Sequence, residues 1–202
     1  IVAAVPLLAV PLIYLTVPPG SLPHMELFAK LMKWGHPYMG PLIFVGVLSL
    51  WGARKAAAHP AKSAFVASFV LFALGGVLGY MIQGVNVVIP AHYHGSTVGV
   101  TLSFMGLAYV LLPALGFGKP DGRMAIWQPY VYGAGQLIHV LGLAWSGGYG
   151  VQRKVAGAEQ ALVTLPQKIG MGMMGLGGAI AVIGGIMFIL VCLKAMTRKA
   201  SA

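Results

Sequence analysis

The chain has 202 residues, of which 58% are hydrophobic and only 8% are charged. A soluble domain carries roughly 25% charged residues, and the mean hydropathy here is +0.86, so the composition excludes an ordinary soluble protein and predicts an integral membrane protein. The formal net charge is +10, but the basic residues are confined to the gaps between apolar segments. This distribution favours loops at a membrane surface over a nucleic-acid-binding surface.

Apolar segments of about 20 residues recur along the chain without the alternation that marks strands, and they predict membrane-spanning helices. A spanning chain must satisfy its backbone hydrogen bonds internally, and helices do so within each segment. We therefore predict an all-α integral membrane bundle of about six transmembrane helices, with residues 1–202 as a single transmembrane domain. The expected spans are, in chain order, residues 1–17, 36–53, 64–89, 92–116, 126–148 and 169–194.

Proline and glycine indicate where these spans end and how they pack. The run from Pro18 to Gly20 ends the first span, and the third and fourth spans are expected to join almost directly around Pro90. The glycines of "GMGMMGLGG" (170–178) predict a smooth helix face for close packing, since small residues let two membrane helices approach.

The basic residues also predict an orientation. With six spans, eight of them fall on the side of the C-terminus and five on the other. Cytoplasmic loops carry the excess of lysine and arginine, so we expect a multi-pass protein of the cell inner (cytoplasmic) membrane with a cytoplasmic C-terminus. The side with five holds Lys30, Lys33, Arg153, Lys154 and Lys168; the other holds Arg54, Lys55, Lys62, Lys119, Arg123, Lys194, Arg198 and Lys199.

Two histidines, His92 and His94, stand one residue apart in "IPAHYHGSTVG" (89–99). Two residues along a helix correspond to a rotation of about 200°, so the two imidazoles should point to nearly opposite sides. A pair that binds one metal from one helix sits at i and i+4 instead. The spacing suits two planar cofactors flanking the helix, each with one axial histidine, as in haem proteins. We expect the following small residues to leave room for such plates: Gly95, Ser96, Gly99 and Ser103.

The alternative is a pair of histidines at the start of an interfacial helix, bonded only to water and backbone. Ionisable residues inside a membrane are expensive to bury, which favours a functional role for the pair. On the spacing alone, both interpretations stay open.

Several segments resemble subunit I of the haem-copper oxidases. "IPAHYHGSTVGVTLSFMGLAYVLLP" (89–113) is similar to the tenth transmembrane helix of that subunit, where an H-x-H pair precedes small residues. Three flanking segments resemble the neighbouring helices of the family, and together the resemblance covers about residues 64–196. They are "FVLFALGGVLGYMIQGVNVV" (69–88) for the ninth helix, "GQLIHVLGLAWSGGYGVQRKV" (135–155) for the eleventh and its following loop, and "MGLGGAIAVIGGIMFILVCLKAM" (174–196) for the last.

The resemblance implies a role for each of four residues. His92 would ligate the high-spin haem where gas is reduced, and His94 the low-spin haem that delivers electrons. Arg153 and Lys154 would bind haem propionates, which lie at the membrane edge and accept charge-assisted hydrogen bonds. The alternative for this basic pair is an ordinary charged loop.

The chain also departs from the family. A complete subunit I has about twelve helices, a second ligand for the low-spin haem and three copper-binding histidines, whereas this chain has six expected spans and no His-His pair. It therefore resembles the C-terminal half of a split subunit. A second membrane chain would supply the remaining haem ligands and most of the copper ligands, and cytochrome c or quinol would donate electrons.

Two further histidines have less defined roles. "KWGHPYMGPLIF" (33–44) is similar to the sixth-helix "GHP" motif of the family, in which His36 would bind copper, but G-H-P is also an ordinary helix entry with proline in the first turn. His139 matches a histidine near the outer end of the eleventh helix. It is expected to bond a propionate, water or backbone, and a ligand role is the alternative.

Three functions remain open from the sequence. The first is the haem-binding half of a terminal oxidase that reduces oxygen to water, active only in a complex; a core of the nitric oxide reductase type is its close variant. The second is a non-catalytic dihaem cytochrome b that exchanges electrons with quinone. The third is a helix bundle without a cofactor, such as half of a transporter, which offers no reason for the H-x-H pair.

No acidic residue falls within an expected span, so a proton path through this chain would need hydroxyl groups and water. Candidates lie along the fourth span: Ser96, Thr97, Thr101, Ser103 and Tyr109. The alternative is that such hydroxyls bond the carbonyl of residue i−4.

Overall fold

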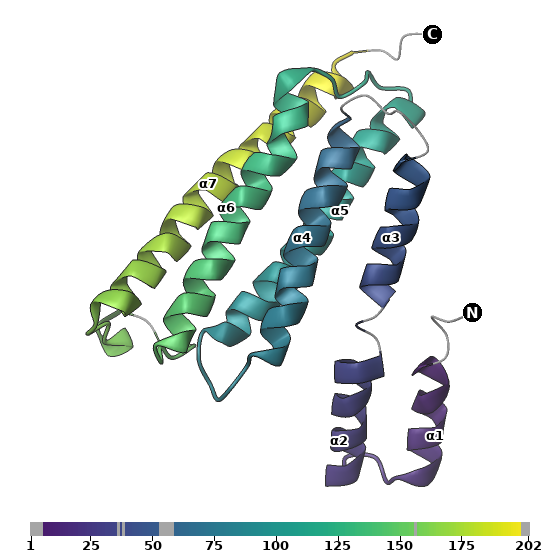
Figure 1. Ribbon diagram of the computed structural model, residues 1–202. Coiled ribbons are helices and arrows are strands. Elements are labelled where there is room, and N and C mark those ends of the chain that lie inside the picture. Colours follow the sequence, from purple (N-terminus) through teal and green to yellow (C-terminus); the bar gives the residue numbers. More distant parts are fainter. Residues whose placement is uncertain (1–5, 36, 38, 53–58, 156, 199–202) are drawn as a thin grey trace. The chain divides into compact units, whose positions relative to one another are not determined.

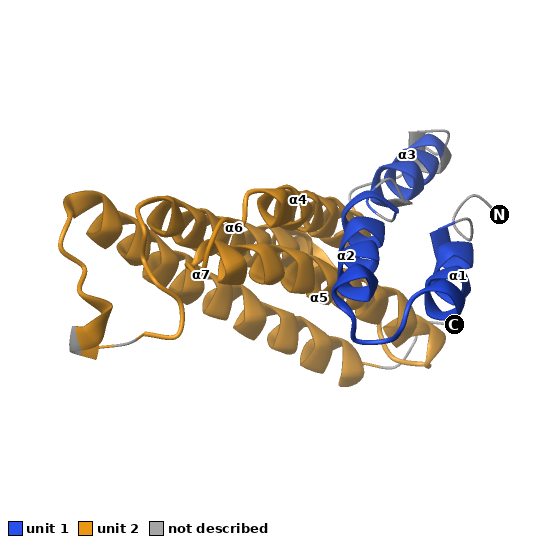
Figure 2. Ribbon diagram, turned by 90° about the horizontal axis from the view of Figure 1, so that it is seen from below, with its two compact units in different colours: residues 1–55 blue, residues 56–202 orange. Residues whose placement is uncertain are grey.

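The chain is all-α in the computed structural model (Figure 1), which describes residues 6–35, 37, 39–52, 59–155 and 157–198. It divides into two compact units, residues 1–55 and residues 56–202 (Figure 2). The all-helical prediction is therefore confirmed, and the candidate site residues His92, His94, Arg153 and Lys154 all lie in the second unit.

The first unit consists of short helices. Its elements are α1 (Ala9–Thr16), α2 (Leu22–Lys30), a π-helical turn (Leu31–Gly35) and α3 (Met39–Gly52). Helices of 8 and 14 residues stand where spans 1–17 and 36–53 were predicted, and a membrane crossing needs about 20. Helix α2 was not predicted; Ser21 accepts a hydrogen bond from the backbone N–H of His24 and so caps its start.

The second unit contains four long helices, which lie side by side and run in alternating directions (Figure 1). Helix α4 packs mainly against α5, and α6 packs mainly against α7, with α5 and α6 joining the two pairs. The elements are α4 (Pro60–Tyr80), α5 (Val88–Ala114), α6 (Gly122–Gly148), a 3-10 turn (Gly157–Gln160) and α7 (Leu165–Met196).

Three of these helices are long and apolar enough to cross a membrane, and this indicates a membrane protein. Among the described residues they are α4, α5 and α7, with mean hydropathies of 1.9, 1.7 and 2.6. They correspond to the predicted spans 64–89, 92–116 and 169–194. The expected count of six is therefore larger than the three that length and composition support. Helix α6 has the required length but falls outside this set, since polar side chains such as Gln128, Gln136 and His139 lie along it.

The predicted junction at Pro90 was wrong in one respect. Helix α4 ends at Tyr80 rather than near residue 89, and a connecting loop precedes α5. Gly84 adopts a φ of 68° in this loop, a conformation that favours glycine. The Asn86 side chain then accepts a hydrogen bond of 3.0 Å from the Val88 backbone N–H, and Pro90 falls in the first turn of α5, where its missing N–H costs nothing.

Close backbone approach through glycine holds each helix pair together. A Cβ atom placed on Gly95 of α5 would lie 2.8 Å from the Cα of Gly75 on α4, and one placed on Gly142 of α6 would lie 2.6 Å from the carbonyl oxygen of Gly170 on α7. Real Cβ contacts are not this short, so these positions require glycine. The predicted packing face over residues 170–178 is thus confirmed at Gly170 and Gly177, whereas a Cβ atom on Gly172 or Gly175 would meet nothing within 4 Å.

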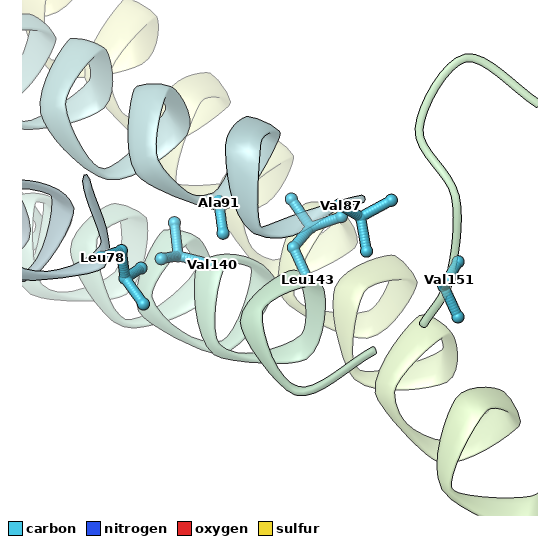
Figure 3. Packing of buried hydrophobic residues seen from close by; sticks show 6 residues of the cluster. All are labelled: Leu78, Val87, Ala91, Val140, Leu143 and Val151. Atoms are coloured by element: carbon cyan, nitrogen blue, oxygen red, sulfur yellow. The ribbon is translucent and has the colours of Figure 1, made fainter. Parts of the chain in front are cut away.

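Two clusters at opposite ends of the second unit fix the register of the helices. A buried polar cluster joins α5, α6 and α7: the Tyr109 hydroxyl donates to Gln128 Oε1 at 2.9 Å, and Gln128 Nε2 donates to the Gly184 carbonyl at 3.1 Å. An apolar cluster at the other end joins α4, α5, α6 and the loop after α6 (Figure 3), and it surrounds the start of α5 where the histidines lie. Its members are Leu78, Val87, Ala91, Val140, Leu143 and Val151.

Candidate functional site

The two histidines of α5 face different neighbouring helices. The His92 ring turns toward α4, where its Nδ1 lies 2.6 Å from the carbonyl oxygen of Gly75. The His94 ring turns toward α6, where its centroid lies 5.0 Å from that of His139. This divergence agrees with the rotation of about 200° expected from their spacing. Each ring therefore has surroundings of its own.

The three histidines at this end share one hydrogen-bonding pattern. The Nδ1 atom of His94 lies 2.8 Å from the Pro90 carbonyl oxygen, and that of His139 lies 2.9 Å from the Met174 carbonyl oxygen. A carbonyl oxygen only accepts hydrogen bonds, so Nδ1 must carry the proton in His92, His94 and His139. In the neutral imidazole, Nε2 then keeps its lone pair free to accept a proton or to bind a metal.

His59, at the start of α4, shows the opposite pattern. Its Nδ1 accepts a hydrogen bond of 3.1 Å from the Ala61 backbone N–H, which caps the helix. The lone pair on Nδ1 is thus used, and the proton of the neutral ring lies on Nε2. The donation of Nδ1–H to a carbonyl is therefore not common to every described histidine.

An imidazole with Nδ1–H bound to a carbonyl is the arrangement that orients metal-ligating histidines in proteins. All three rings are half-buried, so each ring is held in a fixed orientation but is not fully enclosed by the described residues. Among the described residues, no cluster of three or more histidine, cysteine or acidic side chains could hold a metal ion. This end of the second unit therefore offers single oriented imidazoles rather than a cluster of several described metal ligands.

The small residues after His94 do not leave room for flat cofactors, so this expectation was wrong. A Cβ atom on Gly99 would lie 2.8 Å from the Phe72 backbone nitrogen, and the Ser103 hydroxyl is 2.6 Å from that of Ser68. Gly95 is likewise closed by α4. These residues let α4 and α5 pack backbone to backbone.

Two of the hydroxyl groups along α5 donate to carbonyls within the helix, and a third donates to α6. Ser96 donates to the His92 carbonyl and Thr101 to the Thr97 carbonyl, each at 3.0 Å. Tyr109 donates to Gln128, as described above. The i−4 alternative is thus confirmed for the first two, and these bonds do not form a continuous chain of hydroxyls.

The loop after α6 brings Arg153 and Lys154 to the same end as His92. The Val87 backbone N–H donates to the Val151 carbonyl at 3.0 Å, and Asn86 and Gln152 form an isolated β-bridge. These contacts hold residues 151–153 beside the start of α5. Lys154 is exposed and has a φ of 62°, which is uncommon for a residue with a side chain.

Arg153 carries an unsatisfied donor. Its Nε atom is buried and has no hydrogen-bond partner within the part of the chain that is described. Buried donors are nearly always paired, and a guanidinium pairs best with a carboxylate or phosphate. An anionic group from outside these residues would complete the site, which agrees with the propionate role that the resemblance implies.

Two further histidines were candidates for the site. His36, for which copper binding was one of two alternatives, lies outside the described residues. His139 was expected to have a secondary role, yet it lies against His94 and shares its hydrogen-bonding pattern. In the sequence, His139 lies near the end of the next long apolar segment, and this position at the level of the H-x-H pair could have indicated its proximity to His94.

Comparison with known proteins identifies relatives but no activity. The chain is 40% identical over 146 residues to an uncharacterized protein of Rickettsia prowazekii (strain Madrid E), covering 67% of this chain and 28% of that protein. It is 31% identical over 103 residues to an uncharacterized protein of Aquifex aeolicus (strain VF5), covering 50% of this chain and 26% of that protein. The chain thus matches between a quarter and a third of the length of these relatives. No family model matches it, and no solved structure matches significantly.

Proposed function

We propose that this chain is the haem-binding part of a haem-copper-type terminal oxidase, in which His92 and His94 each bind the iron of a different haem. One observation carries the proposal: both rings donate Nδ1–H to a backbone carbonyl and keep Nε2 free. His92 donates to Gly75 on α4, whereas His94 donates to Pro90 within α5 and its ring lies against His139 on α6. The proposed family rests on the resemblance of residues 64–196 to subunit I. The proposed ligands rest on the site, where the two imidazoles are of the type that binds haem iron and face different sides of α5.

The residues present fit two haems. Once bound, the haems would supply electron transfer and the reduction of oxygen to water. His92 would hold the high-spin haem, its ring oriented by the Gly75 carbonyl, and His94 the low-spin haem, its ring oriented by the Pro90 carbonyl. Arg153, with its unpaired buried Nε, would bind a propionate, and Lys154 would add positive charge.

The contact of His94 with His139 differs from the arrangement of two axial imidazoles in the dihaem cytochrome b alternative. In such proteins two imidazoles bind one iron from opposite faces. With metal–nitrogen bonds of about 2.1 Å, their ring centroids lie roughly 6 Å apart. Here the centroids are 5.0 Å apart, the planes are tilted by 41°, and the rings lie against each other. We assign His139 to the side of the low-spin haem, as a neighbour of its ligand. A nitric oxide reductase-type core would use the same residues and differs in the gas that it reduces.

The other ligands come from membrane helices outside these residues. The second axial ligand of the low-spin haem and the copper-binding histidines belong to a second membrane chain in this proposal, with cytochrome c or quinol as the electron donor. The greater length of the relatives makes one longer polypeptide the alternative source. Either arrangement puts the complex in the inner membrane, with the C-terminus cytoplasmic.

Aromatic pairs on α6 support a fourth span. Trp127 and Tyr130 are exposed and in contact near one end of the helix, and Trp145 and Tyr149 are exposed and in contact at the other. Tryptophan and tyrosine gather at the two membrane–water interfaces. Trp145 follows Trp127 by 18 residues, or about 27 Å along a helix, which is close to the ~30 Å hydrocarbon core. We propose that α6 crosses the membrane despite its polar residues.

Optical spectroscopy tests the proposed function. Protein purified from its native membranes with its bound chains should show haem bands in a reduced-minus-oxidised spectrum, and carbon monoxide should shift part of the signal, since it binds only a five-coordinate ferrous haem. A partner carrying at least three intramembrane histidines should co-purify. A haem signal that carbon monoxide leaves unchanged favours the dihaem cytochrome, and the lack of any haem refutes both.

A further inference from the structure

We propose that the end of the second unit opposite the histidines binds the phosphate group of an anionic phospholipid. The inference is independent of the haem proposal. It rests on a small pocket where the loop between α5 and α6 meets the end of α7. Four basic side chains and a single carboxylate line this pocket of about 70 Å³: Lys119, Arg123, Lys194, Arg198 and Asp121.

The charge at this pocket is not balanced by the residues that line it. Asp121, the one acidic residue in the lining, already pairs with Arg198 at 3.1 Å. Lys119, Arg123 and Lys194 therefore leave a net charge of +3 around the pocket at neutral pH. Lysine and arginine concentrated at one point bind phosphate groups through charge-assisted hydrogen bonds.

Backbone hydrogen bonds hold the pocket together. The Gly118 N–H donates to the carbonyls of Ala195 and Arg198, at 3.0 and 2.9 Å, and so joins the α5–α6 loop to the end of α7. A Cβ atom on Gly118 would lie 2.6 Å from the Arg198 side chain, so this approach depends on glycine. The basic residues are thus carried by a loop and a helix end in a fixed relation.

A second cavity beside the pocket favours a lipid over a free anion. It has a volume of about 350 Å³, within the range of small-molecule sites, and shares Lys119 and Asp121 with the basic pocket. Its walls are largely apolar, formed by Pro60, Val110, Pro113 and Ile126. An amphiphile could thus place its phosphate among the cations and its apolar stem in the adjacent cavity, whereas inorganic phosphate would use only the first.

The pocket lies at the ends of the candidate membrane helices, which is where a lipid headgroup would be. It lies where two of the three candidate spans end, α5 at Ala114 and α7 at Met196. The exposed Trp127 and Tyr130, on the second and third turns of α6, mark the interface at the same level. Basic pockets between membrane helices at the cytoplasmic surface bind anionic headgroups, and the excess of basic residues predicts that this end is cytoplasmic.

Native mass spectrometry of the purified protein with its bound chains tests the proposal. Phosphatidylglycerol, added in neutral detergent, should bind in preference to phosphatidylcholine. The double variant Lys119→Gln/Lys194→Gln should lower the affinity for phosphatidylglycerol roughly 30-fold, since each basic residue contributes about 1 kcal/mol. The matched double variant Lys30→Gln/Lys168→Gln removes the same charge elsewhere and should leave the affinity within about twofold of the parent.

A third variant gives an effect of opposite sign. Asp121→Asn removes the competing carboxylate and releases Arg198, so phosphatidylglycerol should bind more tightly, by about fivefold. Equal losses in both double variants, or weaker binding in Asp121→Asn, would overturn the proposal. Competition by millimolar inorganic phosphate that fully displaces the lipid would assign the pocket to a free anion instead, and equal binding of the two lipids would refute it.

Discussion

The imidazoles of His94 on α5 and His139 on α6 lie 5.0 Å apart between centroids, at an angle of 41°. Each ring donates its Nδ1–H to a different carbonyl, that of Pro90 within α5 and that of Met174 on α7. The pair therefore links three helices at the end of the bundle that carries the H-x-H motif. A group bound to Nε2 of His94 has the ring of His139 as an immediate neighbour.

The variant His139→Phe tests whether His139 only lies beside the low-spin haem or is itself a ligand of that haem. We expect the variant to retain the low-spin haem bands, because phenylalanine keeps an aromatic ring against His94. Its free energy of unfolding should fall by about 1–3 kcal/mol, since the Met174 carbonyl loses the hydrogen bond from His139. Reduced-minus-oxidised spectra and thermal unfolding of the purified complex measure the two effects. Loss of the low-spin bands with the protein still folded would make His139 a ligand.

The variants His92→Ala and His94→Ala should each lose the signal of a different haem. His94→Ala should lose the low-spin haem bands while carbon monoxide still binds, and His92→Ala should lose the carbon monoxide shift while the low-spin bands stay. The reason is that the two rings face different helices, α4 and α6. Optical spectra of both variants, with and without carbon monoxide, check this. If each change removed the same single band, the two histidines would share one cofactor.

Arg153→Ala/Lys154→Ala should leave haem bound and lower its midpoint potential. The iron–imidazole bond does not depend on these side chains, but two cations that favour the added electron are lost. Redox titration followed optically measures the shift. Lys168→Ala removes one charge from the same end, at the start of α7, and should have a smaller effect. An unchanged potential in the double variant would make Arg153 and Lys154 ordinary loop charges.

Gly75→Ala should destabilise the protein, whereas Gly76→Ala should not. A Cβ atom on Gly75 would lie 2.6 Å from the Ser96 hydroxyl oxygen and even closer to the backbone of α5, while one on Gly76 meets nothing within 4 Å. Overpacking of this kind costs about 1–3 kcal/mol. Gly75→Ala should also disturb His92, which bonds the carbonyl of that residue. Thermal unfolding in detergent compares the two variants, and equal stabilities would refute the close packing of α4 and α5.

Tyr109→Phe should lower the free energy of unfolding by about 1–3 kcal/mol, because buried Gln128 loses the donor to its Oε1. Tyr130→Phe is the matched control, since that side chain is 42% exposed; it should change stability by less than about 0.5 kcal/mol. Haem spectra should be unaffected by either change, because the cluster around Gln128 lies at the opposite end from the histidines. Similar losses in the two variants would show that the buried hydrogen bond contributes little.

Local patterns predicted the parts of the fold that depend on short stretches of chain. Apolar runs of sufficient length identified α4, α5 and α7, and the helical repeat predicted that His92 and His94 diverge. The same criterion failed where composition does not change at a boundary. The loop that precedes α5 contains Val85 and Val87 and reads as a continuing apolar span, although α4 has already ended at Tyr80 and the loop turns at Gly84 and Asn86. The apolar residues 1–17 likewise contain, among those described, only the short helical segment Pro6–Thr16, which is too short to cross a membrane.

The amino-acid sequence by itself determined that this is an all-helical membrane protein with two imidazoles on opposite sides of one helix. Only the tertiary structure decided what each imidazole faces, because the partners lie far away in sequence: Gly75 is 17 residues from His92, and Met174 is 35 residues from His139. Those carbonyls set the tautomer and free Nε2. The close approach of α4 to α5 also turned Gly95 and Gly99 into packing surfaces rather than cofactor space. Such contacts depend on which helix faces meet, and that choice is made by packing over the whole bundle rather than by any local pattern.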